Sequence, residues 1–535
     1  MPILQWLDRE KTIKQASKVP YRLLEIDARL SYGDETSRNM LIQGDNLEVL
    51  KALLPYYTSK VKCIYIDPPY NTGSAFEHYD DNLEHSKWLD MMYPRLELLR
   101  ELLTEDGFFC CHIDDSESHY LKGIVDEIFG RRNYLTTIYI QVRYPEKTLK
   151  QDMSFHKQIE QIHIYRKSFS AKPILLEKNN SFDKFCFYIK EKALGRELFL
   201  GGKKIVIFQR GEYEIKTSVG SKDGLKEIWA SGTILDGNSS GRFFRDYLTG
   251  RVEQDGLGVL YKVEGIGDDK FQYRYFTGPK KQGATKGKYY QGVPLQQIQN
   301  PDKKRTFPIE GFLDLAADFG NCRLEGETAF RGGKKPEVLL KKILQHFSQS
   351  DDLVLDSFLG SGTTAAVAHK MNRRWIGIEM GEHAKTHCVA RLQKVIDGEQ
   401  GGISKSVAWQ GGGGFRFYNL GESIFDQDGR INKNIKFEHL AAHIWFSETK
   451  TPLNQRDKSS FLGVYNDTAY YLLYNGILGD KSVSGGNVLT TKVLAALPKF
   501  NGLKIIYGET SRLGQLRLED NQIIFKQTPY DIKAR

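Results

Sequence analysis

The stretch from Asp67 to Tyr70 combines residue types that can hold and orient a polar ligand. It reads Asp-Pro-Pro-Tyr and follows residues 61–66, an apolar run typical of a buried parallel strand. Pro68 and Pro69 stiffen the turn and remove two N–H groups, which leaves its carbonyls free to accept hydrogen bonds. Asp67 adds a carboxylate, and the Tyr70 ring offers a face for stacking. This pattern indicates a ligand site at the carboxyl end of a strand, although a rigid turn without further function would look the same.

A second group of candidate residues lies between Leu353 and Glu379. Residues 353–356 and 375–379 have the composition of strands, and each run ends in an acid. Between them, Gly360 and Gly362 permit a sharp turn and a close backbone approach at the start of a helix. Glu379 ends the second of these predicted strands, which is the usual position of an acid that binds ribose hydroxyls. The pattern predicts a nucleoside-cofactor site, and the absence of a following Gly-Lys-Ser/Thr argues against a phosphate loop.

Strand-like and helical segments alternate on both sides of these two groups. The runs that indicate strands end near Asp45, Asp67, Ile113, Val142, Tyr165, Asp356 and Glu379. Segments with helical spacing of apolar residues separate most of them. This alternation predicts an α/β fold with a seven-stranded sheet and helices on both of its faces.

The alternation of strand-like and helical segments is not continued between residues 168 and 331. Short aromatic and β-branched runs, such as 204–208 and 271–276, alternate there with glycine-rich turns and predict a β-rich domain. The segment 277–288 carries four lysines and no acid. These lysines are suited to phosphate contacts, and a solvated loop explains them equally well. They are Lys280, Lys281, Lys286 and Lys288.

Composition limits the kind of protein. A chain of 535 residues with 40% hydrophobic content can bury more than one core, and its net charge of +9 favours a polyanionic partner. The six cysteines have neither a disulfide pattern nor metal spacing. His112, Asp114 and Asp115 follow a strand and could border a pocket or lie in a solvated loop, and we expect no metal site. Without a signal peptide or an 18-residue apolar run, we expect a soluble cytoplasmic protein with no membrane contact.

The two candidate groups together resemble a known family. Asp67-Pro-Pro-Tyr70 resembles the signature of amino-group methyltransferases, and Phe358-Leu-Gly-Ser-Gly362 resembles the turn with which that family binds S-adenosylmethionine. Their order along the chain resembles the β class of DNA amino-methyltransferases. The longer form Asp-Pro-Pro-Tyr-Asn-Thr-Gly, with Gly44-Asp45 nearby, is most similar to modification (Mod) subunits of type III restriction-modification systems.

The resemblance implies a Rossmann-like methyltransferase core interrupted by a target-recognition domain. The core would comprise residues 1–167 and 332–410, and the recognition domain residues 168–331. Residues 411–535 begin with the glycine-rich segment 411–414 and would form a small α/β domain. That domain would contact a second copy of the chain or a partner.

The resemblance also implies roles for the catalytic turn. An adenine flipped out of double-stranded DNA would stack on Tyr70. Its N6 amino group would donate hydrogen bonds to the Asp67 carboxylate and the Pro68 carbonyl in the turn that Pro69 completes. These bonds would aim the nitrogen lone pair at the methyl sulfonium, and Asp67 is a candidate acceptor for the surplus proton.

The cofactor side is implied in the same way. Lys335, before a helix, would reach the carboxylate of S-adenosylmethionine, and Glu379 would bind the ribose. Asp45 would contact the cofactor or cap the following helix, with equal support for each. The full expected set is Asp45, Lys335, Asp356, Phe358, Gly360, Gly362, Thr363 and Glu379.

Other functions fit the same turn. An N4-cytosine or RNA methyltransferase is the nearest alternative, although Asp at position 67 favours adenine. A catalytically silent DNA-recognition subunit of a restriction complex belongs to another class. The expected partners are double-stranded DNA, a second copy of the chain and a restriction subunit with helicase and nuclease activity.

Overall fold

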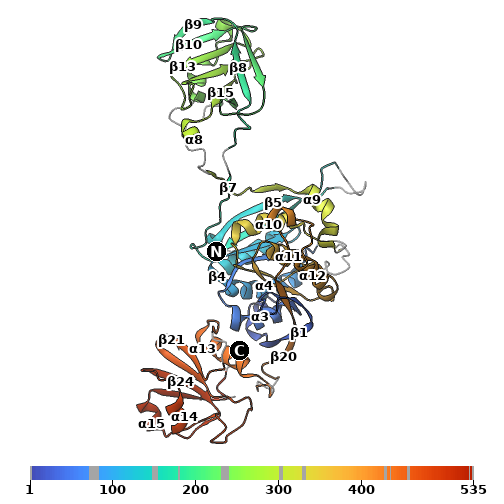
Figure 1. Ribbon diagram of the computed structural model, residues 1–535, viewed down its shortest axis with the longest axis vertical. Helices are drawn as coiled ribbons and strands as arrows, with labels where there is room; N and C mark the ends of the chain where they lie inside the picture. Colours follow the sequence, from blue (N-terminus) through green and yellow to red (C-terminus); the bar gives the residue numbers. More distant parts are fainter. Residues whose placement is uncertain are drawn as a thin grey trace. The chain divides into compact units, whose positions relative to one another are not determined.

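The computed structural model divides the chain into two compact units (Figure 1). The first comprises Met1–Ile174 and Ile309–Arg535, and the second comprises Leu175–Pro308. Thr72 and Gly73 of the Mod-like motif lie outside the described residues. The structure describes residues 3–71, 84–146, 155–178, 181–230, 240–299, 305–327, 330, 333–426, 431–433, 435–454, 458–528 and 530–532.

A ten-stranded sheet forms the centre of the first unit, with the order β1-β20-β2-β19-β18-β3-β4-β6-β5-β17. The expected α/β fold is confirmed, because the seven predicted strands lie side by side in this sheet. They are β2 (Met40–Gln43), β19 (Arg374–Glu379), β18 (Leu353–Asp356), β3 (Val61–Ile66), β4 (Leu103–Ile113), β6 (Ile159–Arg166) and β5 (Tyr134–Gln141). Three further strands extend the sheet beyond seven: β1 (Arg22–Gly33), β20 (Gly414–Ser423) and β17 (Phe312–Asp314).

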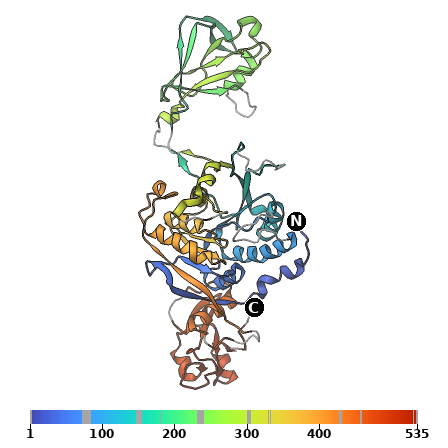
Figure 2. The same ribbon diagram turned by 90° about the vertical axis from the view of Figure 1, so that its right-hand side faces the viewer.

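Helices cover both faces of this sheet (Figures 1 and 2). Along each strand, successive side chains point to opposite faces, so β3 places Ile64 and Ile66 in one core and Cys63 and Tyr65 in the other. The first core is closed by α3 (Asn46–Tyr57), α4 (His85–Leu102) and α5 (Ser118–Val125). The second core is closed by α10 (Glu337–Phe347), α11 (Thr363–Lys370) and α12 (Ala390–Ile396). Burial on both faces explains why the central strands are apolar throughout.

The second unit is built on an eight-stranded sheet of antiparallel neighbours (Figure 1). Its order is β11 (Tyr213–Thr217), β8 (Phe187–Glu191), β12 (Leu225–Trp229), β15 (Lys288–Gly292), β14 (Tyr273–Thr277), β13 (Leu260–Glu264), β10 (Lys203–Phe208) and β9 (Arg196–Leu200). Residues 168–174 and 309–327, which we expected in an inserted domain spanning 168–331, lie in the first unit instead. The reason is that β17 pairs in parallel with β5 of the main sheet.

The C-terminal part of the first unit carries a four-stranded sheet of its own. Its order is β21 (Phe461–Tyr465), β22 (Thr468–Leu472), β24 (Leu503–Gly508) and β26 (Ile523–Gln527). The expected boundary at residue 411 differs from the structure, because β20 pairs with β1 and β2 and so belongs to the main sheet. Helix α13 (Phe437–Thr449) buries Leu440 and Ile444 in the same apolar core as Leu50 and Leu53 of α3.

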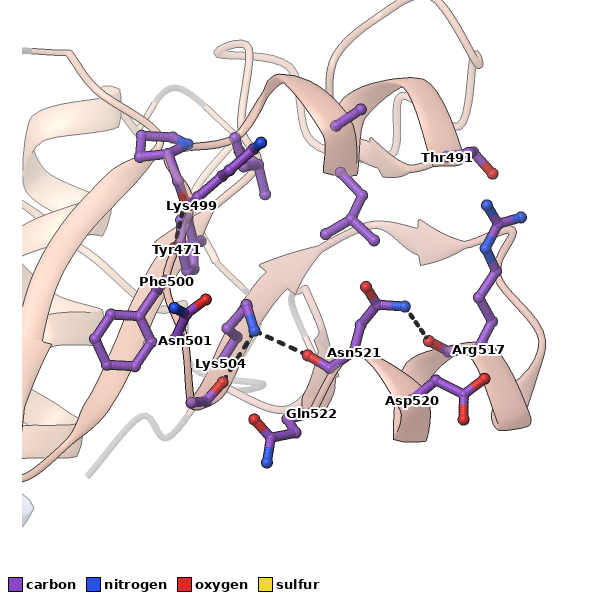
Figure 3. A pocket seen from close by; sticks show the side chains of 15 residues that line it. Tyr471, Thr491, Lys499, Phe500, Asn501, Lys504, Arg517, Asp520, Asn521 and Gln522 are labelled. Atoms are coloured by element: carbon purple, nitrogen blue, oxygen red, sulfur yellow. Dashed lines mark hydrogen bonds between the residues drawn. The ribbon is translucent and has the colours of Figure 1, made fainter.

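A pocket of about 550 Å³ opens at the amino ends of β24 and β26 (Figure 3). Lys504 points into it, and its ammonium donates to the carbonyls of Gly502 and Asn521 at 2.9 Å each. Asp520 is the one acid among the lining residues, which include neither histidine nor cysteine.

The described residues contain neither a candidate metal-binding cluster nor a candidate membrane-spanning helix. In that part of the chain, no cluster of three or more His, Cys, Asp or Glu side chains could hold a metal ion. No helix within the same residues has the length and apolar content needed to cross a membrane.

Candidate active site

Strands β3 and β18 bring the two candidate groups together. They are parallel neighbours in which Cys63 pairs with Val354 and Ile64 pairs with Leu355. Because parallel neighbours end at the same edge of a sheet, the turn after Ile66 and the turn after Asp356 lie side by side. This edge joins the predicted catalytic turn to the predicted cofactor turn.

A residue of helix α4 contacts the turn from Asp67 to Tyr70. The indole N–H of Trp88, which is fully buried, donates to the carbonyl of Pro69 at 2.8 Å. Both prolines restrict φ, and this bond adds a tertiary restraint on the orientation of the turn. The rigidity that the sequence predicts is therefore reinforced by packing.

Asp67 presents two carboxylate oxygens with different surroundings. Its Oδ2 lies 3.0 Å from the ammonium of Lys335. Its Oδ1 is buried and has no hydrogen-bond partner among the described residues. A buried acceptor without a donor is costly, so Oδ1 is an open position for a ligand N–H.

Tyr70 lies against Lys335 and Glu160. Its hydroxyl donates to Glu160 Oε2 at 3.1 Å, and the Lys335 ammonium lies 4.7 Å from the centroid of its ring. Burial raises the pKa of the Tyr70 hydroxyl well above its usual range, with further increases from Asp67 and Glu160. The phenol is therefore neutral, and its ring is held in place at the hydroxyl end.

Glu160 is a site residue that the sequence did not reveal. It lies at the start of β6, 3.5 Å from the Lys335 ammonium and 2.8 Å from His112 Nε2. Burial raises the pKa of Glu160, but Lys335, His112 and Tyr70 outweigh it and lower that pKa below the usual range. An acid in a strand that carries Ile159, Ile162 and Ile164 was the available signal.

His112 lies in the core next to Glu160, and the interpretation as a solvated loop is wrong for this residue. It is fully buried, and the Tyr65 hydroxyl lies 2.7 Å from its Nδ1. Its ring centroid is 6.1 Å from that of Tyr70. Asp114 and Asp115 instead form ion pairs with Lys157, at 3.0 and 2.7 Å.

The turn after β18 has the conformation that its glycines permit. Gly360 and Gly362 have φ values of 58° and 81°, in the left-handed region that favours glycine. The Gly360 N–H donates to Glu379 Oε2 at 2.7 Å, and the Gly381 N–H donates to Glu379 Oε1 at 3.1 Å. Glu379, at the end of β19, therefore holds the turn in place from the neighbouring strand.

Asp356 and Thr363 brace the two ends of this turn. Asp356 accepts from the N–H of Phe358 at 2.9 Å and from the Thr364 hydroxyl at 2.6 Å. Burial raises the pKa of Asp356 to about 7. Thr363 begins α11, and its hydroxyl accepts from the buried guanidinium of Arg391 at 2.7 Å.

Asp45 caps helix α3, which confirms one of its two predicted roles. Its Oδ1 accepts from the Leu47 N–H at 2.8 Å and from Arg95 Nη2 at 2.8 Å. The amide of the next residue, Asn46, donates to the carbonyl of Ser357 at 2.7 Å. This end of α3 thus contacts the turn after β18, while a contact between Asp45 and a cofactor stays a prediction.

Lys335 lies beside the catalytic turn. We expected it at the carboxylate of a cofactor, and in the structure its ammonium lies between the carboxylates of Asp67 and Glu160. The expected cofactor contact stays a prediction.

The four predicted DNA-contacting lysines fall into two groups in the second unit. Lys280, Lys281 and Lys286 are exposed in the loop between β14 and β15. Lys288, in β15, forms an ion pair with Glu227, and its ammonium lies 4.9 Å from the centroid of the Trp229 ring. Only the three loop lysines therefore present a free cationic surface among these four.

Comparison with known proteins supports the resemblance. A family model described as DNA methylase matches residues 61–390. The chain is 33% identical over 411 residues to the probable type III restriction-modification enzyme HindVI Mod subunit of Haemophilus influenzae, covering 72% of this chain and 54% of that protein. It is 28% identical over 417 residues to the type III enzyme EcoPI Mod subunit of Escherichia phage P1, covering 69% of this chain and 61% of that protein.

The chain thus spans between half and two thirds of the length of these Mod subunits. Among solved structures, PvuII DNA methyltransferase (cytosine-N4-specific) matches with 14% identity and a TM-score of 0.34, covering 70% of this chain and 91% of that one. The family match includes both the Asp67 turn and the Gly360 turn. The chain belongs to the DNA methylase family.

Proposed function

We propose that this chain transfers the methyl group of S-adenosylmethionine to the N6 amino group of an adenine flipped out of double-stranded DNA. The observation that carries this proposal is the pairing of β3 with β18, which places the Asp67 turn beside the Gly360 turn. We propose that these two turns form the two sides of one pocket. The family match and the Mod relatives support the same reaction. We further propose that the chain is a modification subunit that acts on DNA in the cytoplasm.

The donor side of the pocket fits the proposed cofactor. Two glycines with positive φ precede α11, so a ligand can approach the backbone closely at a helix amino terminus. Phe358 and Gly360 would line the cofactor, and Glu379 would accept from its ribose hydroxyls while it holds the turn. Bound there, S-adenosylmethionine supplies a methyl group on a positively charged sulfur.

The target side of the pocket fits an amino group. The open Oδ1 of Asp67 would accept one N–H of the adenine amine, and the carbonyl of Pro68 would accept the other. Two acceptors make the nitrogen more tetrahedral and direct its lone pair toward the methyl group. The Tyr70 ring, held at its hydroxyl by Glu160, would support the flipped base by stacking.

The step depends mainly on positioning. S-adenosylmethionine held at the Gly360 turn would supply the methyl group to the amine nitrogen held at Asp67, and its sulfur would keep the electron pair of the broken carbon–sulfur bond. The methylated nitrogen then loses one proton. Asp67 is the nearest proposed acceptor, because its carboxylate already holds that N–H.

The proposed partners are double-stranded DNA, a second copy of the chain and a restriction subunit with helicase and nuclease activity. The proteins named as Mod subunits of type III enzymes support the last of these. Light scattering of the purified chain tests the homodimer directly. A mass equal to one chain at micromolar concentration would reject it.

Identification of the methylated nucleoside tests the proposed reaction. The full chain is incubated with S-adenosylmethionine labelled in the methyl group and with DNA of mixed sequence to which RNA has been added. Both nucleic acids are then digested to nucleosides. We expect N6-methyladenine from the wild type. Label in N4-methylcytosine, label only in added RNA or no label at all would reject the proposal, and the last result would favour a silent recognition subunit.

A further inference from the structure

The Lys335 ammonium lies at two side chains that the mechanism assigns to the target adenine, the Asp67 carboxylate and the Tyr70 ring. It lies 3.0 Å from Asp67 Oδ2 and 4.7 Å from the centroid of the Tyr70 ring. Its side chain is 8% exposed, so these contacts are shielded from solvent and are correspondingly strong. In this position the lysine holds Asp67 Oδ2 beside the open Oδ1, and it lies against the ring on which the adenine would stack.

An ammonium on Asp67 also opposes the chemistry. It weakens the carboxylate as an acceptor for the amine N–H, and its charge repels the positive charge that would develop on the nitrogen. Methyl transfer therefore needs a second place for the Lys335 charge. Because the side chain is buried, a carboxylate nearby is the favourable second place for its charge.

Glu160 has the geometry of that second carboxylate. Its Oε2 is already 3.5 Å from the Lys335 ammonium. Three groups hold it rigid: the Tyr70 hydroxyl at 3.1 Å, His112 Nε2 at 2.8 Å and, behind His112, the Tyr65 hydroxyl at 2.7 Å from Nδ1. A lysine has a flexible stem, so a small movement transfers its charge from one carboxylate to the other.

We propose that Glu160 is a positioning residue of the methyl-transfer site, which takes over the Lys335 ammonium when the target amine engages Asp67. Through the Tyr70 hydroxyl it also keeps the ring in place for the incoming base. This inference rests on the proposed function. It assigns Lys335 a role as the cation that pairs with Asp67 before the target amine binds, in addition to any contact with the cofactor.

The variant Glu160→Gln removes the second carboxylate and keeps the size of the side chain. We expect kcat to fall about 10- to 100-fold, because the target amine would be less well positioned at Asp67. The Kd for S-adenosylmethionine should change less than about twofold. DNA with 2-aminopurine at the position that the wild type methylates should show a weaker flipping signal. Glu160→Asp, which restores the charge, should recover part of both kcat and the signal.

A double variant distinguishes this mechanism from a general loss of structure. If Glu160→Gln leaves Lys335 held on Asp67, then adding Lys335→Met should raise the activity of Glu160→Gln at saturating cofactor. Lys157→Met is the matched control, because Lys157 pairs with Asp114 and Asp115 and not with the catalytic turn. In the same background it should restore nothing.

Lys335→Met by itself keeps the test valid if Glu160→Gln does not fold. Because this variant removes the ammonium that lies against the Tyr70 ring, the 2-aminopurine signal should be at least that of the wild type. A weaker signal would overturn the inference. Wild-type kcat in Glu160→Gln, or no gain in the double variant, would overturn it as well. Failure of the wild type to methylate DNA would instead reject the proposed function.

Discussion

At the scale of single residues, the chemistry depends on which acceptors the fold leaves open. Trp88 takes the carbonyl of Pro69, and Lys335 takes one oxygen of Asp67. The other oxygen of Asp67 is buried and without a partner within the described chain. The Asp67 carboxylate therefore offers an arriving donor one open oxygen, Oδ1.

Tyr70 provides a direct test of base stacking. Tyr70→Ala removes the ring, and we expect a loss of about 1–3 kcal/mol in the binding of the flipped base, or roughly 5- to 150-fold in kcat/KM. Tyr70→Phe is the matched control, because it keeps the ring and removes only the bond to Glu160. Steady-state kinetics with saturating cofactor measure both. Equal losses in the two variants would show that the ring face contributes nothing.

Asp356 makes stability depend on pH. Burial raises its pKa from 3.8 to about 7 in the folded chain, so the folded state retains a proton that the unfolded state releases. The resulting stabilisation is full below pH 4 and is lost as pH rises through about 7, up to about 4 kcal/mol. Asp356→Asn cannot ionise, and its Tm should fall less between pH 5 and pH 8 than that of the wild type.

Thermal unfolding at the two pH values checks this prediction. Some slope should remain in the variant, because burial also raises the pKa values of Glu97 and Glu325 to about 7. A slope equal to that of the wild type would mean that Asp356 is ionised throughout.

Residues of the candidate site could be predicted from the sequence only where they belong to a local motif. Asp67 and Tyr70 stand in a distinctive turn, and Gly360 and Gly362 precede a helix, so local spacing was sufficient. Glu160 was missed because its role depends on the pairing of β6 with β4, which places it beside His112 and Tyr70. No local pattern specifies such a register.

At the scale of elements, the same distinction between local and tertiary information applies. The seven central strands were predictable, because burial on both faces requires continuous apolar runs. Strand β1 was missed, since it is a sheet edge with half-buried and exposed residues in mixed order. Strand β17 has three residues and is a strand only through its pairing with β5.

The loop between β14 and β15 is the element in which DNA binding can be tested. Replacing Lys280, Lys281 and Lys286 by Ala should weaken DNA binding and reduce the slope of log K against log salt by up to about 3. Lys288→Ala should leave the slope nearly unchanged, because that lysine already pairs with Glu227. Fluorescence anisotropy across a salt series measures both. An unchanged slope in the triple variant would make the loop a solvated surface.

At the scale of the whole molecule, the C-terminal sheet and the main sheet share an apolar core. Ile444 of α13 and Leu472 of β22 belong to the same buried cluster as Leu50 and Leu53 of α3. The Tyr56 hydroxyl also lies 2.9 Å from His439 Nδ1. We therefore expect this part of the chain to unfold together with the main sheet.

Ile444→Ala tests this coupling. It should cost about 2–5 kcal/mol, because the side chain is 1% exposed, and unfolding should remain a single transition. Leu516→Ala, at a position that is 78% exposed, is the control and should change stability by less than about 0.5 kcal/mol. Calorimetry or urea unfolding reports both. A separate early transition in Ile444→Ala would contradict the shared core.

The central claim is that one pocket has a target side at Asp67 and a donor side at Gly360. The most direct measurement compares wild type and Asp67→Ala for methyl transfer to DNA, with the product identified as a nucleoside, and for the Kd of S-adenosylmethionine. We predict N6-methyladenine from the wild type, a loss of product by at least about 100-fold in the variant, and a cofactor Kd within about twofold of wild type. Undiminished N6-methyladenine from Asp67→Ala, or loss of cofactor binding together with activity, would contradict the claim.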